Sequence, residues 1–186
     1  DKALHVIADD QNNIFVTGTF TNTNVDFDPS VNQTLLSSAG LEDVFIIKLT
    51  DSGSLSWAKS FGNANNDYVT DIAVFSGGVF LSGKVKGITD FISNTNSGPP
   101  GGNSNYDGYV LKINPTDGTY KWHRFMGVAS GDNEITCLSI RTAGVKALFA
   151  GGYVSGTQNA TFTFGATTDG VKSGTINGYT TNQSQL

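Results

Sequence analysis

Short apolar runs alternate with turn-forming residues along the whole chain. The runs lie at residues 4–8, 14–18 and 44–49, and similar ones return further along, at 71–75, 79–83, 109–113, 135–140 and 147–151. They are rich in Val, Ile, Phe and Tyr, which are residues that favour β-strands. No window carries apolar residues at helical spacing between helix caps, so we predict no helix.

The runs belong to a repeat. From Asp43 to Asp107 the offset is 64 residues, and from Trp57 to Trp122 it is 65. The run 14–18 returns at 79–83 and again at 147–151, offsets of 65 and a further 68. Each unit contains four apolar runs, and a fixed period of this length indicates a repeat architecture. We therefore predict units at 1–62, 63–127 and 128–186, the third without its last strand.

The strands themselves favour a particular packing. Residues 44–49 and 109–113 are apolar at nearly every position, whereas a strand with one wet face alternates. Continuous apolar runs suit sheets covered on both faces, as in the blades of a β-propeller. Asp51-Ser52-Gly53 and Asp117-Gly118 mark the hairpins between third and fourth strands. The predicted fold is all-β, a propeller-like array of four-stranded antiparallel blades, about 2.75 in this chain. A two-sheet sandwich is the competing fold, which the repeat period disfavours.

The composition of the chain argues against two classes of partner, nucleic acids and membranes. Charged residues make up 15% of the chain and the net charge is −5, with basic residues scattered singly. Such a surface does not suit nucleic acid or an anionic membrane. No apolar stretch reaches the length of a membrane span. The chain starts at Asp1, and we expect a mature or trimmed product, or a piece of a longer protein.

Few residues of the chain are candidates for catalysis or metal binding. Cys137 lies in the apolar run 135–140, so we expect a buried strand position. His5 and His123 fall in strands and are too few and too far apart for a zinc site. No nucleophile elbow or phosphate-binding loop occurs. We predict that the chain is not an enzyme and has no catalytic or cofactor-binding residues. An acid-pair glycosidase remains a minor alternative.

Asp26 and Asp28 are the weak candidates for a metal site. Carboxylates two residues apart on an extended segment face the same side and could bind Ca²⁺. The other units carry only Asp90, or no acid, at this place, so a turn is the favoured interpretation. Four acids near the first strands of the later units are expected to bind loop amides: Asp67, Asp71, Asp132 and Glu134. Glycosylation sequons begin at Asn32, Asn159 and Asn182.

Several of these segments resemble a known family. The segments 13–18, 25–29, 43–49, 53–57 and 66–74 resemble the bacterial β-propeller repeat family called SBBP. The resemblance is close in the first two units and weaker in the third. It implies a propeller fold and an extracellular or cell-surface location, and no particular activity. Residues 114–122 also resemble the tryptophan docking motif of quinoprotein dehydrogenases, which implies that a turn and a Trp lock adjacent blades together.

An incomplete set of blades exposes the outer apolar faces of its first and last members. Large exposed apolar faces and free strand edges are rare in monomers. We expect further blades of a longer chain, or other copies of this one, to cover them. The predicted function is an extracellular scaffold used in adhesion, a surface layer or a filament. The alternative is a carbohydrate- or protein-binding propeller domain of a larger secreted protein, in which case glycans are partners.

Overall fold

The computed structural model describes residues 1–87, 89, 91, 104–127, 131–144 and 147–155, with the backbone of 161–162 and 174–175. Every regular element within these residues is a β-strand, and none of them is helical. The stretch 93–105, whose Asn, Ser, Gly and Pro residues predict an exposed loop, lies outside the described residues apart from its last two positions. Asn159 and Asn182 lie outside them too.

The first sheet confirms the four-strand unit. Its strands run in the order β1-β2-β5-β6, each antiparallel to the next: β1 (Lys2–Ala8), β2 (Ile14–Phe20), β5 (Asp43–Leu49) and β6 (Leu55–Phe61). The connection between β2 and β5 forms a hairpin of its own, from β3 (Val25–Asp26) and β4 (Leu35–Leu36). The apolar pattern did not predict this hairpin, because its strands are only two residues long.

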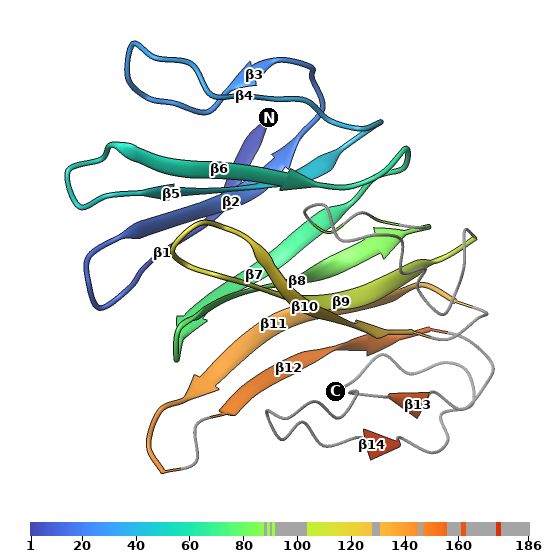
Figure 1. The fold of residues 1–186 in the computed structure, drawn as a ribbon. Coiled ribbons are helices and arrows are strands. Elements are labelled where there is room, and N and C mark those ends of the chain that lie inside the picture. The colour runs from blue at the N-terminus through green and yellow to red at the C-terminus, as the bar shows by residue number, and fades with distance from the viewer. Residues whose placement is uncertain are drawn as a thin grey trace.

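The second sheet repeats the first, and the third begins in the same way. The second contains β7 (Tyr68–Phe75), β8 (Gly78–Lys86), β9 (Tyr106–Ile113) and β10 (Tyr120–Met126). Within the described residues the third contains β11 (Asn133–Arg141) and β12 (Ala147–Val154), while β13 (Thr161–Phe162) pairs with β14 (Gly174–Thr175). The three sheets are stacked from the top of Figure 1 to the bottom. The described strands form no closed ring.

A β-bulge marks the same place in every unit. The first strand bulges immediately after Ala3, Val69 and Ile135, and these residues pair with Gly18, Gly83 and Gly152. At each of these glycines an added Cβ would collide with a backbone carbonyl of the first strand. Glycine is therefore required where the bulged backbone comes close. The shared register assigns equivalent positions in the three sheets.

Turn chemistry follows the predicted signals. Gly53 and Gly118 adopt positive φ angles of 82° and 70° in the hairpins before β6 and β10. The two-residue turn between β7 and β8, Ser76-Gly77, has positive φ at both positions, as a hairpin turn requires. These turns allow consecutive strands to pair directly.

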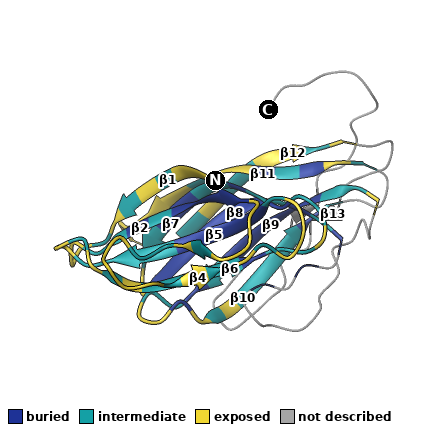
Figure 2. Cartoon of the chain, turned by 90° about the horizontal axis from the view of Figure 1, so that it is seen from above, coloured by how far each residue is buried: buried dark blue, intermediate teal, exposed yellow. Residues whose placement is uncertain are grey.

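Burial differs between the sheets. In the second sheet β8 and β9 are buried along most of their length, since the other two sheets cover both of its faces. In the outer sheets β1 and β12 carry many exposed residues (Figure 2). The prediction of two covered faces thus holds for the middle sheet alone, because only that sheet has a neighbour on each side.

Candidate interaction surface

One apolar cluster joins the first sheet to the second. Phe15, Val44 and Ile46 of the first sheet pack there against Leu81 and Leu111 of the second, and all five side chains are fully buried. Successive residues of a strand point to opposite faces of the sheet, and paired residues on adjacent strands point to the same face. The residues between these buried ones therefore lie on the outer face of the first sheet. Burying such side chains contributes about 1.5–3 kcal/mol each. The contact therefore stabilises the packing of the first sheet on the second.

Trp57 joins the two sheets at the outer edge of this junction by a hydrogen bond and a packing contact. Its indole Nε1 donates a hydrogen bond of 3.3 Å to the carbonyl of Pro115, in the turn before β10. The ring also lies against Gly118, where an added Cβ would come within 2.9 Å of it. A turn of one unit thus holds the tryptophan of the preceding unit, as the docking-motif resemblance implies.

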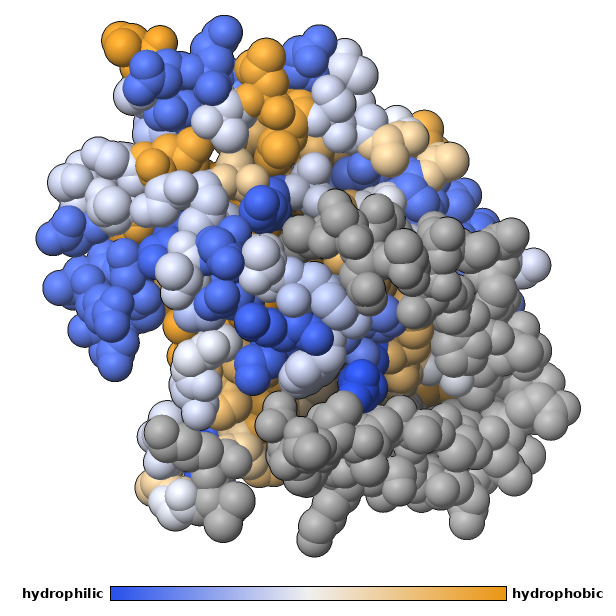
Figure 3. Space-filling model, in the orientation of Figure 1, coloured by the Kyte–Doolittle hydropathy of each residue, from blue (hydrophilic) through white to orange (hydrophobic). Residues whose placement is uncertain are grey.

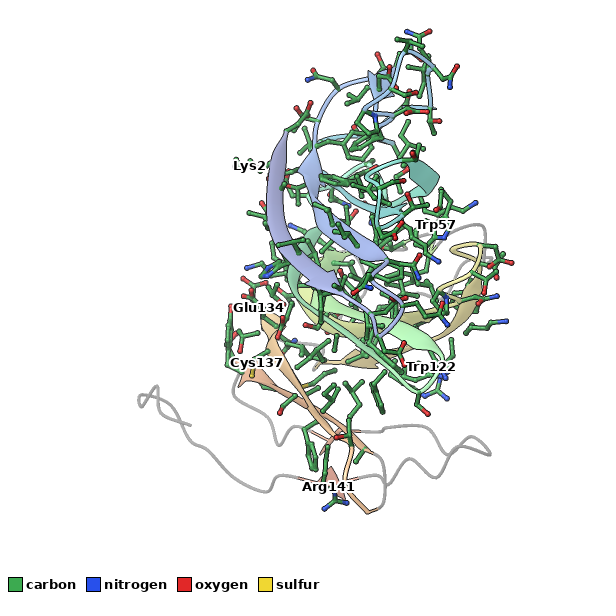
Figure 4. The ribbon with its side chains drawn as sticks, turned by 90° about the vertical axis from the view of Figure 1, so that its left-hand side faces the viewer. Lys2, Trp57, Trp122, Glu134, Cys137 and Arg141 are labelled. Atoms are coloured by element: carbon green, nitrogen blue, oxygen red, sulfur yellow. The ribbon has the colours of Figure 1, made fainter. Side chains whose placement is uncertain are left out.

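The equivalent Trp122 also lies beside a phenylalanine of its own sheet, but it has no such hydrogen bond within the described residues. Phe15 lies 6.0 Å from Trp57, and its equivalent Phe80 lies 6.0 Å from Trp122. Trp57 and Trp122 project on the same side of the stack, opposite to Cys137 and Lys2 (Figure 4). The Nε1 atom of Trp122 is buried without a hydrogen-bond partner. A buried donor left unpaired costs about 1–3 kcal/mol, and no carbonyl of the described residues takes the place that Pro115 has beside Trp57.

Polar contacts give the junction between the second and third sheets its register. The carboxylate of Asp71 on β7 accepts a hydrogen bond of 2.7 Å from the backbone N of Leu138 on β11. The hydroxyl of Thr70 donates to the carbonyl of Ile135. Lys84 forms an ion pair of 3.0 Å with Glu134. Beneath these contacts Val110, Met126 and Ile135 form an apolar cluster.

The outer side of the first sheet is an apolar surface that, among the described residues, only the short β3–β4 hairpin partly covers. We call it the leading face; it is formed by Val6, Ile14, Val16, Ile47 and Leu49. Val6 is 69% exposed, whereas its equivalent Ile72 in the second sheet is 7% exposed. The other four are partly exposed, while their equivalents Val79, Leu81, Leu111 and Ile113 are fully buried against the first sheet. The leading face therefore has the composition of a buried junction.

The β3–β4 hairpin covers one end of the leading face. Phe27 packs against Phe45 at 4.7 Å and against Phe20 at 5.4 Å. In consequence Phe20 and Phe45 are buried, although both belong to the outer side of the sheet. Hydrophobic residues also reach the surface around the hairpin (Figure 3), where Val31 and Leu35 are exposed.

The outer side of the third sheet is the second such surface, and its large side chains are exposed among the described residues. We call it the trailing face; it is formed by Cys137, Ser139, Phe149, Gly151 and Tyr153. Phe149 is 53% exposed, whereas its equivalents Phe15 and Phe80 are 0% and 4% exposed in junctions. Cys137 is exposed, so the expectation of a buried cysteine was wrong. Its strand is apolar in sequence, but this side of the strand is exposed in the part of the chain that the structure describes.

Two buried carboxyl groups lie between the first and second sheets. Asp43 opens β5 and Asp67 precedes β7, and they are 2% and 0% exposed. Burial raises the pKa of Asp43 to about 6. Burial, with the nearby charge of Asp43, raises the pKa of Asp67 to about 7. Asn63 donates its backbone N–H to Asp67, so this acid does bind a loop amide as predicted. No pattern in the sequence predicted that the side chain of Asp67 would be fully buried.

The metal candidates of the β3–β4 hairpin form turns. Asp26 accepts hydrogen bonds from the backbone N of Asp28 and of Thr34, at 3.0 and 2.9 Å. These bonds lower the pKa of Asp26. Asp28 in turn accepts from the N of Ser30. In the described part of the chain no three His, Cys, Asp or Glu side chains are grouped as metal ligands. The hairpin also exposes Asn32.

The histidines are separate from each other and from the free faces. His5 lies on β1, opposite Thr17. His123 lies on β10, its ring 4.8 Å from Phe91, and its Nδ1 is 3.0 Å from the hydroxyl of Tyr120. Burial lowers the pKa of His123. An aromatic packing role accounts for these contacts.

No protein-family model matches the chain, and no curated protein resembles it. In the described residues no helix has the length and apolar character to cross a membrane.

Proposed function

We propose that this chain is part of an extracellular scaffold of propeller-type repeats, and that its leading face binds a further repeat of the same kind. The exposure of Val6 carries the proposal: its equivalent Ile72 is buried by the preceding sheet. Apolar sheet surfaces of this kind are binding surfaces when they are exposed. The scaffold serves adhesion, a surface layer or a filament, and it does so without catalysis.

An aromatic contact supports the same conclusion. In the first junction Phe61 of β6 packs 5.2 Å from Phe91 and 5.7 Å from Tyr109 of the second unit. The equivalents of these last two in the first unit are Phe27 and Phe45, which already contact each other. A preceding sheet would supply the third ring, at the place that Phe61 takes in the existing junction.

A duplication tests the proposal for the leading face. Residues 1–66 are added once more ahead of the chain, so that Asn66 is joined to Asp1, the equivalent of Asp67. The added unit should cover the leading face and bury the original Val6. Val6→Lys in that original unit should then lower the free energy of unfolding by about 2–3 kcal/mol, since a charge enters an apolar junction. In the unduplicated chain the same substitution should have an effect of less than about 0.5 kcal/mol.

Val31→Lys is the matched control, because Val31 is 100% exposed and lies away from the sheet pairing. It should be tolerated equally in both proteins, as measured by urea unfolding. Equal tolerance of Val6→Lys in both would contradict the proposal, since it would show that an adjacent repeat leaves the leading face uncovered.

A further inference from the structure

The leading and trailing faces are the two halves of one junction. In each internal junction a face with a phenylalanine on the second strand, Phe15 or Phe80, meets the face of the next sheet that carries Ile72 or Leu138. The trailing face presents the equivalent phenylalanine, Phe149. The leading face presents the equivalent of the other half, Val6. Both are open to solvent.

The internal junction also predicts the register between these faces. Asp71 on the second sheet reaches the backbone of Leu138 on the third. By the bulge register, Cys137 is the equivalent of Asp71, and Val6 is the equivalent of Leu138. A junction between the two free faces therefore places Cys137 beside Val6.

A second contact agrees with this register. Thr70 donates its hydroxyl proton to the carbonyl of Ile135 in the internal junction. Its equivalent on the trailing face is Thr136, and the equivalent of Ile135 on the first sheet is Ala3. The hydroxyl of Thr136 would thus meet the carbonyl of Ala3. Each of these residues lies at or beside the bulge that all three sheets share.

We propose that the trailing face of one copy of this chain binds the leading face of a second copy, in the register of the internal junctions. The proposal rests on the proposed function, since it names a second copy as the source of the covering sheet. Unlike faces meet in such a contact, so it is heterologous. Such contacts produce a closed ring if the rotation closes, and otherwise a filament that keeps one free face of each kind at its two ends.

The opposite pairing, leading face against leading face, does not reproduce a junction of the chain. It would bring Val6, Val16 and Ile47 of two copies together without the phenylalanine and tryptophan that fill the first junction. Identical faces would also form a closed dimer that leaves Phe149 exposed. The internal junctions thus favour the unlike pair.

A single substitution, Val6→Cys, tests the register. Cys137 is the chain's one cysteine and is exposed, so the variant has one thiol on each proposed partner face. A disulfide needs Cα atoms within about 7 Å, so it forms only where the two positions meet. Under mild oxidation the variant should yield a ladder of covalent dimers and larger species on a non-reducing gel. Peptide mass spectrometry should identify the link as Cys137 to the introduced cysteine.

Matched variants make the result specific. Val31→Cys places a thiol at a more exposed position outside the proposed contact, and it should still give about one tenth as much ladder or less. Adding Cys137→Ser to Val6→Cys should abolish the ladder. Adding Phe149→Asp should reduce its yield about tenfold, because the central aromatic contact is lost.

Two results would overturn the head-to-tail contact. One is cross-linking of Val6→Cys no faster than that of Val31→Cys. The other is a link between two introduced cysteines at position 6, which requires leading faces to meet. Neither result bears on the duplication of residues 1–66. If that duplication buries Val6 while no ladder forms, the leading face binds a repeat of the same chain, and the proposed contact between copies is wrong. Failure of the duplication would contradict the proposed function itself.

Discussion

Asn133 donates a hydrogen bond of 3.3 Å from its side-chain nitrogen to the carboxylate of Asp107, at the junction of the second and third sheets. At the equivalent place in the first junction both residues are acids, Asp43 and Asp67. The Oδ1 atom of Asp43 is buried there without a hydrogen-bond partner. An amide can donate to a carboxylate, whereas a second carboxylate can do so only when it is protonated. The first junction therefore favours a bound proton that the second does not need.

This difference predicts pH-dependent stability. The pKa of Asp43 is raised to about 6 and that of Asp67 to about 7, from an ordinary value of 3.8. The folded chain then binds more protons than the unfolded chain between these values, so stability falls as the pH rises from about 4 to about 7 and is level above. Urea unfolding across this range measures the change.

Asp67→Asn should remove most of that dependence by copying the Asp107–Asn133 pair. We expect the variant to be more stable than the parent by about 2 kcal/mol at pH 8 and nearly unchanged at pH 4. Asp51→Asn is the control, because it makes the same charge change at an exposed turn position. If both substitutions raised the free energy of unfolding equally, the cause would be the net charge and not the buried pair.

The two tryptophans should respond differently to the same substitution. Trp57→Phe loses the hydrogen bond to Pro115 and leaves that carbonyl to solvent, and we expect a loss of about 1–2 kcal/mol beyond the loss of ring area. Trp122→Phe removes a buried N–H that has no partner, so its hydrogen-bond cost should be absent. Chemical denaturation of both variants gives the comparison. If Trp122→Phe were the more damaging, the equivalence of the two sites would be wrong.

Gly83→Ala should be more destabilising than Gly53→Ala. At Gly83 a Cβ would collide with the backbone carbonyl of Tyr68, which the bulge holds in place. At Gly53 nothing lies within 4 Å of an added Cβ, and only its φ of 82° opposes a side chain. We expect about 1–2 kcal/mol for the turn position and about 3 kcal/mol or more for the bulge position. Thermal unfolding would reveal a reversed order, which would place the strain in the turn.

Alanine substitutions at Ile72 and Val6 in the unduplicated chain compare equivalent positions on a covered and an uncovered sheet face. Ile72→Ala removes buried atoms from the first junction and should lower the free energy of unfolding by about 2–4 kcal/mol. Val6→Ala removes atoms that are already in solvent and should change it by less than about 0.5 kcal/mol. Measurements at low protein concentration keep contacts between copies from contributing. Similar losses at both positions would mean that something covers the leading face.

Local patterns determined much of the fold. Apolar runs, the repeat offsets and the Asp-Gly turns predicted strands and their pairing in the first two units, because strand propensity, turn conformation and neighbouring pairing act over a few residues. The β3–β4 hairpin was missed, since its strands are too short to show a pattern. Asp26 and Asp28 were correctly favoured as turn residues, because such hydrogen bonds are local.

By itself the sequence established that this is a repeating all-β chain with strands apolar on both sides, a property of residue order alone. Only the tertiary structure decided which of those sides are covered. The buried side of a strand depends on a neighbouring sheet that is many residues away in the sequence. For this reason Cys137 and Phe149 are exposed, whereas Asp43 and Asp67 are buried between two sheets. Val6 and Ile72 occupy the same place in the same repeat, and only the presence of a preceding sheet separates them.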